Sequence, residues 1–369
     1  MSKSRICARP RPLLYLEYEE EVAMQGVPGG RSAAWRIGAA FLTIAVSLWG
    51  ASCGAELRAS RAETVEVAAR IRSGFSAIRI AEDSMVATIE SVYAESASLD
   101  LSVGKMDVED GGVFATFEGN KYYYKTLRSG CSYYCSPLRP VDDAMRREIR
   151  IMGYFEGALQ KASESLPPYL DIIFYGIHEP LSIAMLYPAF DIVSIFPPGV
   201  RFTDFEWYDR GLESPGPGRW SALPFADLIN GWVMDFSKPV KAGGATKGVA
   251  VISVDIMKAS EYYLGKAVAP LVLIASDSTL MGASPKARAL FGLAPLEDEA
   301  LVKQMTANRF VPSAQRLDDA SRPADIRSLA SRVLAGESRF EQRIGAASWA
   351  VESIRIPEIG FYLVGLGRH

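Results

Sequence analysis

The strongest constraint on the fold is the stretch 57–98, which contains no proline and a single glycine, Gly74. A helix of about 40 residues is about 60 Å long, which exceeds the length of a typical globular helix. We therefore expect it to run along its own domain, to pair with a second copy of itself as a homodimer, or to do both. Glu82 interrupts an apolar stripe whose intervals are threes and fours, or sums of these, and so follow one helix face: Ile71, Phe75, Ile78, Met85, Ile89 and Val92.

A weakly apolar run at 37–52 precedes this helix, with Arg31 and Arg36 before it. The run is at or just below the length of a transmembrane helix, and it also suits the core of a signal peptide. Because the nearest basic residues precede the run, we expect the rest of the chain to lie outside the cytoplasm. Residues 36–55 are therefore predicted to be a signal, transmembrane or lipoprotein segment.

Cys53 follows a Gly-Ala-Ser sequence, which is similar to a bacterial lipobox, where the cysteine is lipidated. The usual leucine is replaced by Gly50. A lipoprotein, an uncleaved anchor and full secretion remain open. Residues 1–35 contain four glutamates between 17 and 21, whereas a leader begins with positive charge. They are predicted to be a cytoplasmic tail or to precede the true start, for which Met24 is the candidate.

The composition argues against nucleic-acid binding and against several enzyme classes. The net charge of −3 gives no basic footprint for nucleic acid. The two histidines are His178 and His369, and His178 lacks the second histidine of a zinc-protease motif. No phosphate-binding or dinucleotide-binding glycine motif is present. We expect that the protein is not an enzyme and that it holds no metal or cofactor. Acid–base catalysis by carboxylates alone stays open, because it has no local sequence signature.

Cys131 and Cys135 lie in a sequence rich in glycine, proline and serine. Two close cysteines in a loop outside the cytoplasm can pair, and we predict a disulfide between them. Free thiols are the second interpretation. A metal site is the third, and it lacks further cysteine or histidine ligands nearby.

The middle of the chain alternates between helix and strand patterns. Two β-prone runs around Gly119-Asn120 predict a hairpin, and 142–165 is amphipathic and predicts a second helix. Short apolar and aromatic runs bounded by glycine and proline then predict strands at 169–176, 182–188, 190–197, 231–240 and 248–256. The last two form an antiparallel hairpin.

A smaller set of elements follows a short helix from Met257. A strand at 269–276, helices at 284–292 and 322–336, and strands at 338–344, 348–356 and 360–366 are predicted. Helix first and strands later is an α+β layout. We divide the chain after the long helix into a membrane-distal module, 99–257, and a membrane-proximal module, 258–369.

The stretch from Tyr187 to Ile256 resembles the double Cache (dCache) family, the extracytoplasmic sensor domains of bacterial chemoreceptors and sensor kinases. The order and spacing of these elements carry the resemblance: Tyr187-Pro188 with Asp191, Phe196-Pro197-Pro198, Trp207-Tyr208, Gly216-Pro217-Gly218-Arg219-Trp220, Pro224-Phe225-Ala226-Asp227, Gly231-Trp232-Val233, Lys238-Pro239-Val240, Gly248-Val249 and Val254-Asp255-Ile256.

The resemblance implies two PAS-like antiparallel-sheet modules on one long N-terminal helix, with a ligand in the membrane-distal module. In the amino-acid-binding subgroup, an arginine before the Trp-Tyr pair grips the ligand carboxylate, and Phe205 stands there in this sequence. A tyrosine of the subgroup is replaced by Phe225. Asp227 and Asp255 stand where the subgroup places acids toward the ligand amine. Two of these four amino-acid-binding residues are therefore missing.

The residues themselves predict a small-molecule site with apolar walls and one carboxylate. Trp207 and Tyr208 supply aromatic faces, with Tyr187, Phe205 and Phe225 nearby, and Asp227 supplies the charge. A carboxylate beside aromatic faces suits an amine or a cation. The alternatives are that the aromatics, with Trp220 and Trp232, belong to the core, that Asp227 caps a turn and that Asp255 caps a helix.

The sequence therefore predicts a small-molecule sensor outside the cytoplasm, anchored to a membrane, that signals to a separate protein. The rival prediction is a structural or adaptor lipoprotein that has kept the fold and lost its ligand. The phenylalanines at 205 and 225 favour this rival.

Overall fold

The structure is a computed structural model, and it describes residues 31–101, 112–117, 120–125, 130–136, 141–177, 182–189, 201, 205–214, 216–221, 225–227, 231–293 and 316–368. Side chains are described from Ala55 onward, except at 112–117, 120–125, 171, 225–227 and 231. The chain divides into two compact units, 1–52 and 53–369. In the described part of the chain, no helix combines the length and the apolar character needed to cross a membrane.

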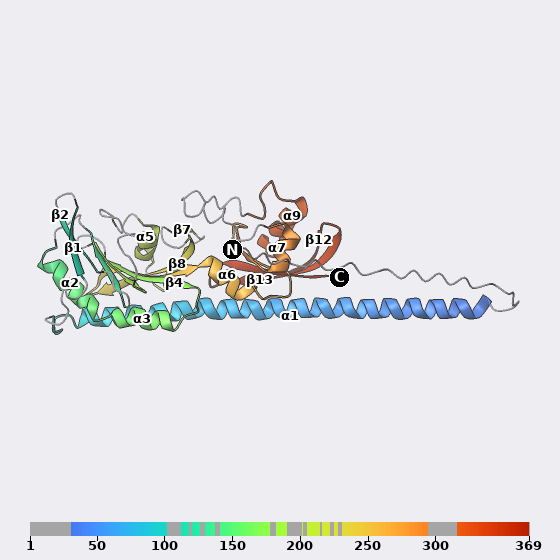
Figure 1. Cartoon of the computed structure of the whole chain (residues 1–369), viewed down its shortest axis with the longest axis horizontal. Helices are drawn as coiled ribbons and strands as arrows, with labels where there is room; N and C mark the ends of the chain where they lie inside the picture. Colours follow the sequence, from blue (N-terminus) through green and yellow to red (C-terminus); the bar gives the residue numbers. More distant parts are fainter. Residues whose placement is uncertain are drawn as a thin grey trace, which may run out of the picture. The chain divides into compact units, whose positions relative to one another are not determined.

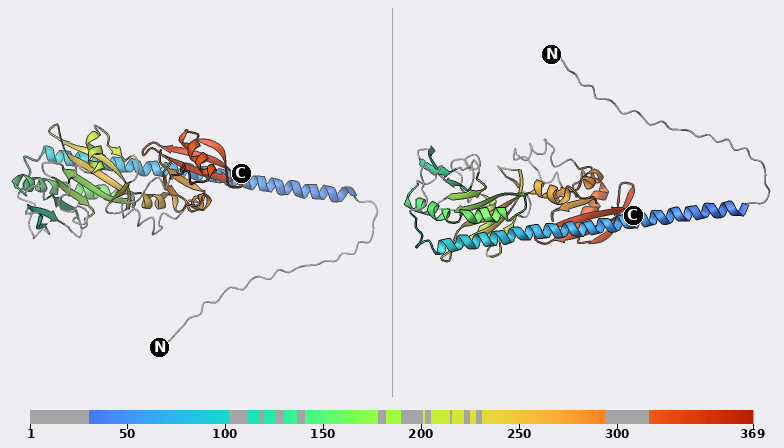
Figure 2. Two further views of the ribbon diagram at one scale, coloured as in Figure 1. Left: turned by 90° about the horizontal axis from the view of Figure 1, so that it is seen from above. Right: turned by 60° about the horizontal axis from the view of Figure 1, so that its bottom comes forward.

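The predicted long helix is confirmed as α1 (Arg31–Ala94), which also contains the apolar run. Its predicted apolar stripe is buried except at Val92, which is half-buried, and Ile71, Ile78 and Ile89 have no exposed surface. From residue 55 onward α1 lies along the elements of both sheets (Figures 1 and 2). The helix therefore buries its stripe against its own domain, as expected; pairing with a second copy stays a prediction.

The first sheet has nine antiparallel strands, in the order β1-β2-β3-β5-β4-β9-β8-β6, and β7 also pairs with β8. The β8–β9 pair is the predicted hairpin. The strands are β1 (Gly112–Phe117), β2 (Asn120–Lys125), β3 (Ser132–Cys135), β4 (Leu170–Ile177), β5 (Ile183–Tyr187), β6 (Arg219–Trp220), β7 (Phe225–Asp227), β8 (Gly231–Ala242) and β9 (Ala245–Asp255). The strand predicted at 190–197 lies outside the described residues.

The second sheet has five strands in the order β11-β10-β14-β13-β12. The predicted α+β layout, with a long helix and two antiparallel sheets, is confirmed. Helix α6 (Ile256–Leu264) connects the sheets, and the other elements are β10 (Leu271–Ile274), β11 (Leu280–Ala283), α7 (Pro285–Phe291), α9 (Ala324–Leu334), β12 (Arg339–Ile344), β13 (Ala347–Ile356) and β14 (Phe361–Arg368).

The single helix predicted at 142–165 is wrong, because two helices occupy this stretch, α2 (Asp143–Gly153) and α3 (Glu156–Glu164). At the break, the N–H groups of Tyr154 and Phe155 donate to carbonyls three residues back instead of four. The tighter turn lets the Phe155 ring enter the core, where it is fully buried. Burial of this ring is a tertiary contact that the amphipathic pattern does not contain.

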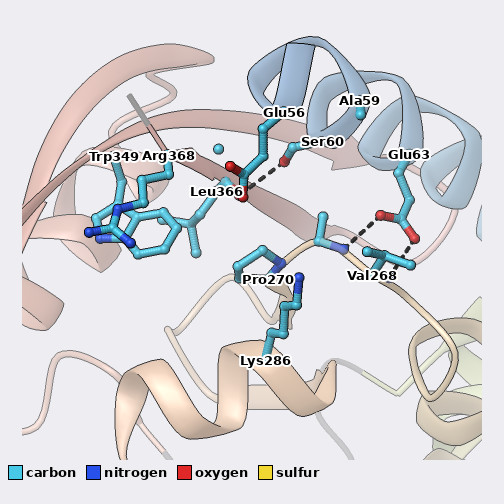
Figure 3. Close-up of a pocket in the computed structure, with 12 residues that line it drawn as sticks. Glu56, Ala59, Ser60, Glu63, Val268, Pro270, Lys286, Trp349, Leu366 and Arg368 are labelled. Atoms are coloured by element: carbon cyan, nitrogen blue, oxygen red, sulfur yellow. Dashed lines mark hydrogen bonds between the residues drawn. The ribbon is translucent and has the colours of Figure 1, made fainter. Parts of the chain in front are cut away.

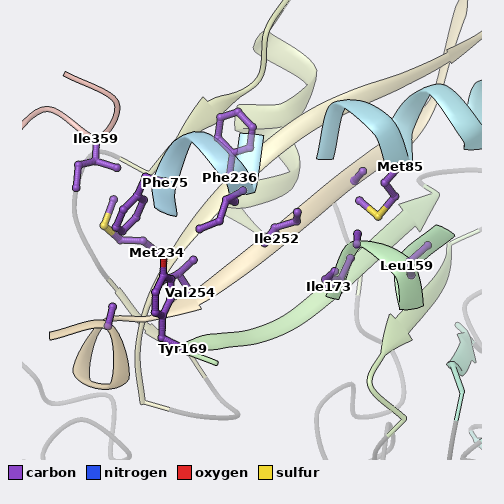
Figure 4. Close-up of a cluster of buried hydrophobic side chains, with 14 of the residues drawn as sticks. Phe75, Met85, Leu159, Tyr169, Ile173, Met234, Phe236, Ile252, Val254 and Ile359 are labelled. Carbon is purple, nitrogen blue, oxygen red and sulfur yellow. The ribbon is translucent and has the colours of Figure 1, made fainter. Parts of the chain in front are cut away.

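The two faces of the nine-stranded sheet pack against different helices. One face packs on α1 and α3 through a continuous apolar cluster, part of which Figure 4 shows. That cluster contains Met234 and Phe236 of β8 and Ile252 and Val254 of β9. Because side chains alternate along a strand, the residues between these four belong to the opposite face, where α5 (Glu206–Glu213) lies.

The five-stranded sheet contacts α1 through glycines of β14. A Cβ atom at Gly365 would lie 1.9 Å from Thr64 Oγ1, and one at Gly367 would lie 2.6 Å from Leu57 Cδ1. Ser60 Oγ donates a hydrogen bond of 2.9 Å to the Leu366 carbonyl. The helix therefore approaches the β14 backbone more closely than side chains at these positions would permit.

Gly74 allows a second close approach, where α1 meets a buried tyrosine pair. The hydroxyl groups of Tyr169 and Tyr263 lie 2.6 Å apart. A Cβ atom at Gly74 would lie 1.8 Å from the Tyr263 oxygen and 2.6 Å from the Tyr169 oxygen. Tyr169 precedes β4 and Tyr263 belongs to α6, so the single glycine of the predicted helix lies where the two sheets are connected.

Glu82, which interrupts the apolar stripe of α1, is completely buried. Neither of its carboxylate oxygens has a hydrogen-bond partner among the described residues. Burial raises the pKa of this carboxyl well above its usual value; Lys238 opposes the shift, and Asp83 and Asp235 add to it. Lys238 is itself paired with Asp83, at 2.5 Å. The buried carboxyl of Glu82 is therefore more easily protonated than an exposed one.

Replacement of Gly74 by alanine is expected to lower the free energy of unfolding by about 1–3 kcal/mol, the usual result of overpacking a core. The matched control is Gly157→Ala in α3, where nothing lies within 4 Å of the added Cβ atom. There alanine should be neutral or should stabilise by up to about 1 kcal/mol. Denaturant unfolding of both variants checks this, and equal effects at the two positions would contradict the close contact.

Replacement of Glu82 by glutamine is expected to stabilise the protein relative to the wild type, by an amount that grows as pH rises. A carboxyl whose pKa is higher in the folded state than in the unfolded state stabilises the fold. This contribution is complete at pH values below the unfolded-state pKa, about 4.3. This contribution is lost as pH rises toward the folded-state pKa, by at most about 1.4 kcal/mol per pH unit. The difference in unfolding free energy between E82Q and the wild type should therefore grow through this window.

The control for this comparison is Glu66→Gln, at an exposed position of the same helix. It should follow the wild-type pH dependence. An E82Q variant that follows the wild type at every pH would show that folding does not raise the pKa of Glu82.

Candidate functional site

The α5 face of the nine-stranded sheet carries the predicted Trp-Tyr pair. Trp207 and Tyr208 are buried in an apolar cluster with strands β4, β5 and β9. A Cβ atom at Gly176 would lie 2.9 Å from the Trp207 ring, and one at Gly211 would lie 2.3 Å from Val249. Two glycines, one in the sheet and one in the helix, therefore let α5 lie close on the strands.

Three aromatic rings form a stack at this place. The Trp207 ring stacks with those of Phe174 and Phe205; the ring centroids are 5.9 Å apart in each pair, and the interplanar angles are 14° and 24°. Tyr208 meets Trp207 edge-on at 5.5 Å. Phe205, which the resemblance sets at the position of an arginine, is thus an apolar member of this stack.

Buried polar side chains lie on the same face of β8 and β9. Asp235 pairs with Ser253 across the two strands, and Ser237 pairs with Val251 of the apolar cluster. Asp235 is 2% exposed, and the two serines have no exposed surface. Four polar residues, including Asp255, therefore follow the α5 cluster along the sheet.

The hydroxyl oxygens of Ser237 and Ser253 have no hydrogen-bond partner among the described residues. A buried hydroxyl left without a partner costs about 1–3 kcal/mol. This cost is removed when a bound molecule supplies the missing hydrogen bonds. The two hydroxyls are therefore the strongest indication of a ligand position on this face.

Sequence reasoning missed Asp235, Ser237 and Ser253. The signal was present in β8, where polar residues at 235 and 237 alternate with Met234 and Phe236. Such alternation predicts one apolar and one polar face. Both faces of this strand are buried, so the polar side chains are held inside the protein.

The structure does not bring Tyr187 to this face, as the prediction required. Tyr187 ends β5 and packs against the cluster that faces α1. Its neighbour Leu186 belongs to the α5 cluster, and successive side chains of a strand point to opposite faces. Trp220 and Trp232 also pack in the α1-facing cluster.

Two further predicted residues lie on strands at the edge of this site. The strand pairing puts Phe225 opposite Val233 and Asp227 opposite Gly231. Asp255 caps α6, since its carboxylate accepts a hydrogen bond of 2.9 Å from the Lys258 N–H. It also pairs with the Lys258 ammonium at 3.1 Å. Asp255 therefore has the capping role that the sequence left open.

One cation lies on α5 itself. Arg210 pairs with the exposed Glu206 at 3.5 Å. Its Nη1 atom is buried and has no hydrogen-bond partner among the described residues. Sequence reasoning did not single out this guanidinium, which stands three residues after Trp207.

The predicted disulfide between Cys131 and Cys135 is wrong, because both are buried thiols that no disulfide joins. Cys135 belongs to β3, and a strand rises about 3.3 Å per residue, so four residues span about 13 Å. The Cα atoms of a disulfide lie within about 7 Å. Burial raises the pKa of the Cys135 thiol. The free-thiol interpretation is the one that the structure supports.

The described residues contain no cluster of three histidine, cysteine, aspartate or glutamate side chains placed to hold a metal ion. His178 and His369 lie outside the described residues. The described residues of this face carry aromatic rings, hydroxyl groups, carboxylates and the guanidinium of Arg210.

No protein-family model matches this chain, and no curated protein gives a significant match. Solved structures with some likeness are ligand-binding domains of bacterial chemoreceptors. The domain of Pseudomonas fluorescens CtaA in complex with L-isoleucine is 15% identical, with a TM-score of 0.39, over 59% of this chain and 76% of that one. The domain of Pseudomonas aeruginosa PctB in complex with L-Arg is 12% identical, with a TM-score of 0.35, over 57% and 78%.

The sensory domain of Campylobacter jejuni Tlp3 with isoleucine bound is 8% identical, with a TM-score of 0.40. The match covers 84% of this chain and 95% of that one.

Proposed function

We propose that this protein is a small-molecule sensor that acts outside the cytoplasm and binds its ligand on the α5 face of the nine-stranded sheet. The observation that carries the proposal is the pair of buried hydroxyls, Ser237 and Ser253, without partners among the described residues. They follow the aromatic stack of Trp207 along the same face. A mostly apolar site with a few convergent polar groups is the usual form of a small-molecule site.

The ligand is proposed to carry an amine or another cation. Asp227 and Asp235 bring carboxylates to β7 and β8, and aromatic faces add about 0.5–2 kcal/mol to the binding of a cation. Phe205, in the ring stack, offers no charge to a ligand carboxylate. Arg210 is the described group through which a carboxylate would bind instead.

The signal is proposed to pass to a separate protein at the membrane, with α1 as the connection. Glu63 and Ser60 of α1 bond to the linker before β10 and to β14, while Asp83 pairs with Lys238 of β8. A homodimer through the exposed side of α1, where Ile80 is 64% exposed, is part of this proposal.

The rival proposal is an adaptor lipoprotein without a ligand. The observation that favours it is the close packing of Trp207 on the sheet, because its ring leaves no room for a side chain at Gly176. A ligand screen separates the two, because a specific ligand raises the melting temperature and an adaptor without a ligand shows no such shift.

Asp227→Ala is expected to abolish binding of any amine that shifts the melting temperature of the full chain in such a screen. The reason is the loss of the proposed counter-charge, and the free energy of unfolding should stay within about 0.5 kcal/mol of the wild type. Calorimetry on the full chain measures both affinities. The control is Asp209→Ala, which removes an exposed acid from α5.

The Asp227 variant binding the amine as tightly as the wild type would contradict this assignment. A screen that finds only anions, with affinity lost in Arg210→Ala, would assign the site to carboxylates.

Cys53→Ser is expected to abolish lipid labelling of the exported protein if the N-terminus is processed as a lipoprotein. The reason for this prediction is that Cys53 directly follows the apolar run at 37–52. Cell fractionation of the wild type gives the wider test, since an anchored protein is recovered with membranes. Full recovery in the soluble fraction would rule out an anchor of either kind.

A further inference from the structure

A cavity remote from the α5 face lies between α1 and the five-stranded sheet. Its volume is about 480 Å³, which falls within the range of about 300–1,000 Å³ for small-molecule pockets. Residues of α1 form one side, and α7, the linker before β10 and the ends of β13 and β14 form the other. Figure 3 shows Lys286 on α7, on the side of the pocket opposite α1.

The walls of this pocket are fixed by hydrogen bonds of their own. The Glu63 carboxylate accepts the N–H groups of Val268 at 2.8 Å and of Ala269 at 2.7 Å. Ser60 Oγ donates to the Leu366 carbonyl. These bonds hold α1 against the linker and β14, so the pocket is formed before any ligand binds.

Three charged side chains in the lining remain unpaired among the described residues. Glu56 comes from α1, Lys286 from α7 and Arg368 from the end of β14, and all three are exposed. Glu56 and Lys286 thus lie on opposite sides of the cavity, and Arg368 lies beside Trp349, as Figure 3 shows. Such an arrangement is complementary to a molecule that carries both charges.

The rest of the lining is largely apolar. Val268 is 68% exposed, and Pro270, Ala59 and the ring of Trp349 add further apolar surface. The Trp349 Nε1 atom is buried and has no hydrogen-bond partner among the described residues. An apolar body fits this surface better than a small hydrated ion does.

We propose that this pocket is a second ligand site, which takes a small zwitterion with an apolar body. The ammonium group pairs with Glu56, the carboxylate pairs with Lys286 and Arg368, and the body covers Trp349 and Val268. Opposite charges on the ligand match opposite charges on the walls, so no charge is left unpaired on binding, which would be costly. The site is independent of the one proposed on the α5 face.

Three probes that share an indole ring test the charge requirement: L-tryptophan is a zwitterion, tryptamine a cation and indole-3-propionate an anion. Calorimetry on the full chain should give the tightest binding for tryptophan, by about tenfold or more over each of the others, since one charge-assisted contact is lost in each. Lys286→Ala should weaken tryptophan and indole-3-propionate but leave tryptamine unchanged. Glu56→Ala should weaken tryptophan and tryptamine but leave indole-3-propionate unchanged.

The position of binding is tested by filling the cavity. Ala59→Phe places a ring in the pocket from an exposed position of α1 and should remove tryptophan binding. Ala62→Phe and Lys266→Ala, at exposed positions outside the lining, are the matched controls and should bind as the wild type does. Equal binding of the three probes, or tryptophan binding that survives Ala59→Phe, overturns the proposal.

Discussion

Burial of one face of α1 is the interaction on which the rest of the structure depends. The inner faces of both sheets are covered by this helix, and its stripe forms one apolar cluster with strands from each of them. Residues of α3 and α6 complete this cluster. Burial of apolar surface contributes about 25 cal/mol per Å², so a helix that covers two sheets ties the stability of one to the other.

Polar contacts fix the position of α1 along the sheets. Asp83 pairs with Lys238 of β8, and Glu90 accepts the backbone N–H of Lys241, at 2.8 Å. Ser60 bonds to β14 in the other sheet. Since these contacts are specific to position, a shift of α1 against either sheet would break them. A ligand can drive such a shift only through contacts that differ between the two positions.

The repeating patterns of the sequence predicted the helix and most strands, because burial of one face leaves a period of 3.6 or 2 in the chain. What failed were assignments that depend on pairing in space. Tyr187 was expected at the ligand site, yet the phase of β5 turns it toward α1. A change of one residue in phase moves a side chain to the other face, and no local pattern in a strand buried on both faces reveals that phase.

The cysteines and the polar residues of β8 illustrate the same limit. A segment rich in small residues predicted a loop with a disulfide, whereas pairing with β2 and β5 draws Ser132–Cys135 into the sheet as β3. Asp235 and Ser237 alternate with apolar residues in the sequence, but their burial depends on α5 and the strands around them. The buried hydroxyls that carry the proposed site are therefore a property of the fold.

Native-state hydrogen exchange, read by mass spectrometry on peptides from α1, β4 and β14, tests the central role of α1 most directly. If one helix ties the two sheets together, the most protected amides of all three elements should open with the same free energy, equal to that of global unfolding. Exchange in β14 at a clearly lower free energy, while α1 and β4 stay protected, would contradict this account and show that the five-stranded sheet unfolds by itself.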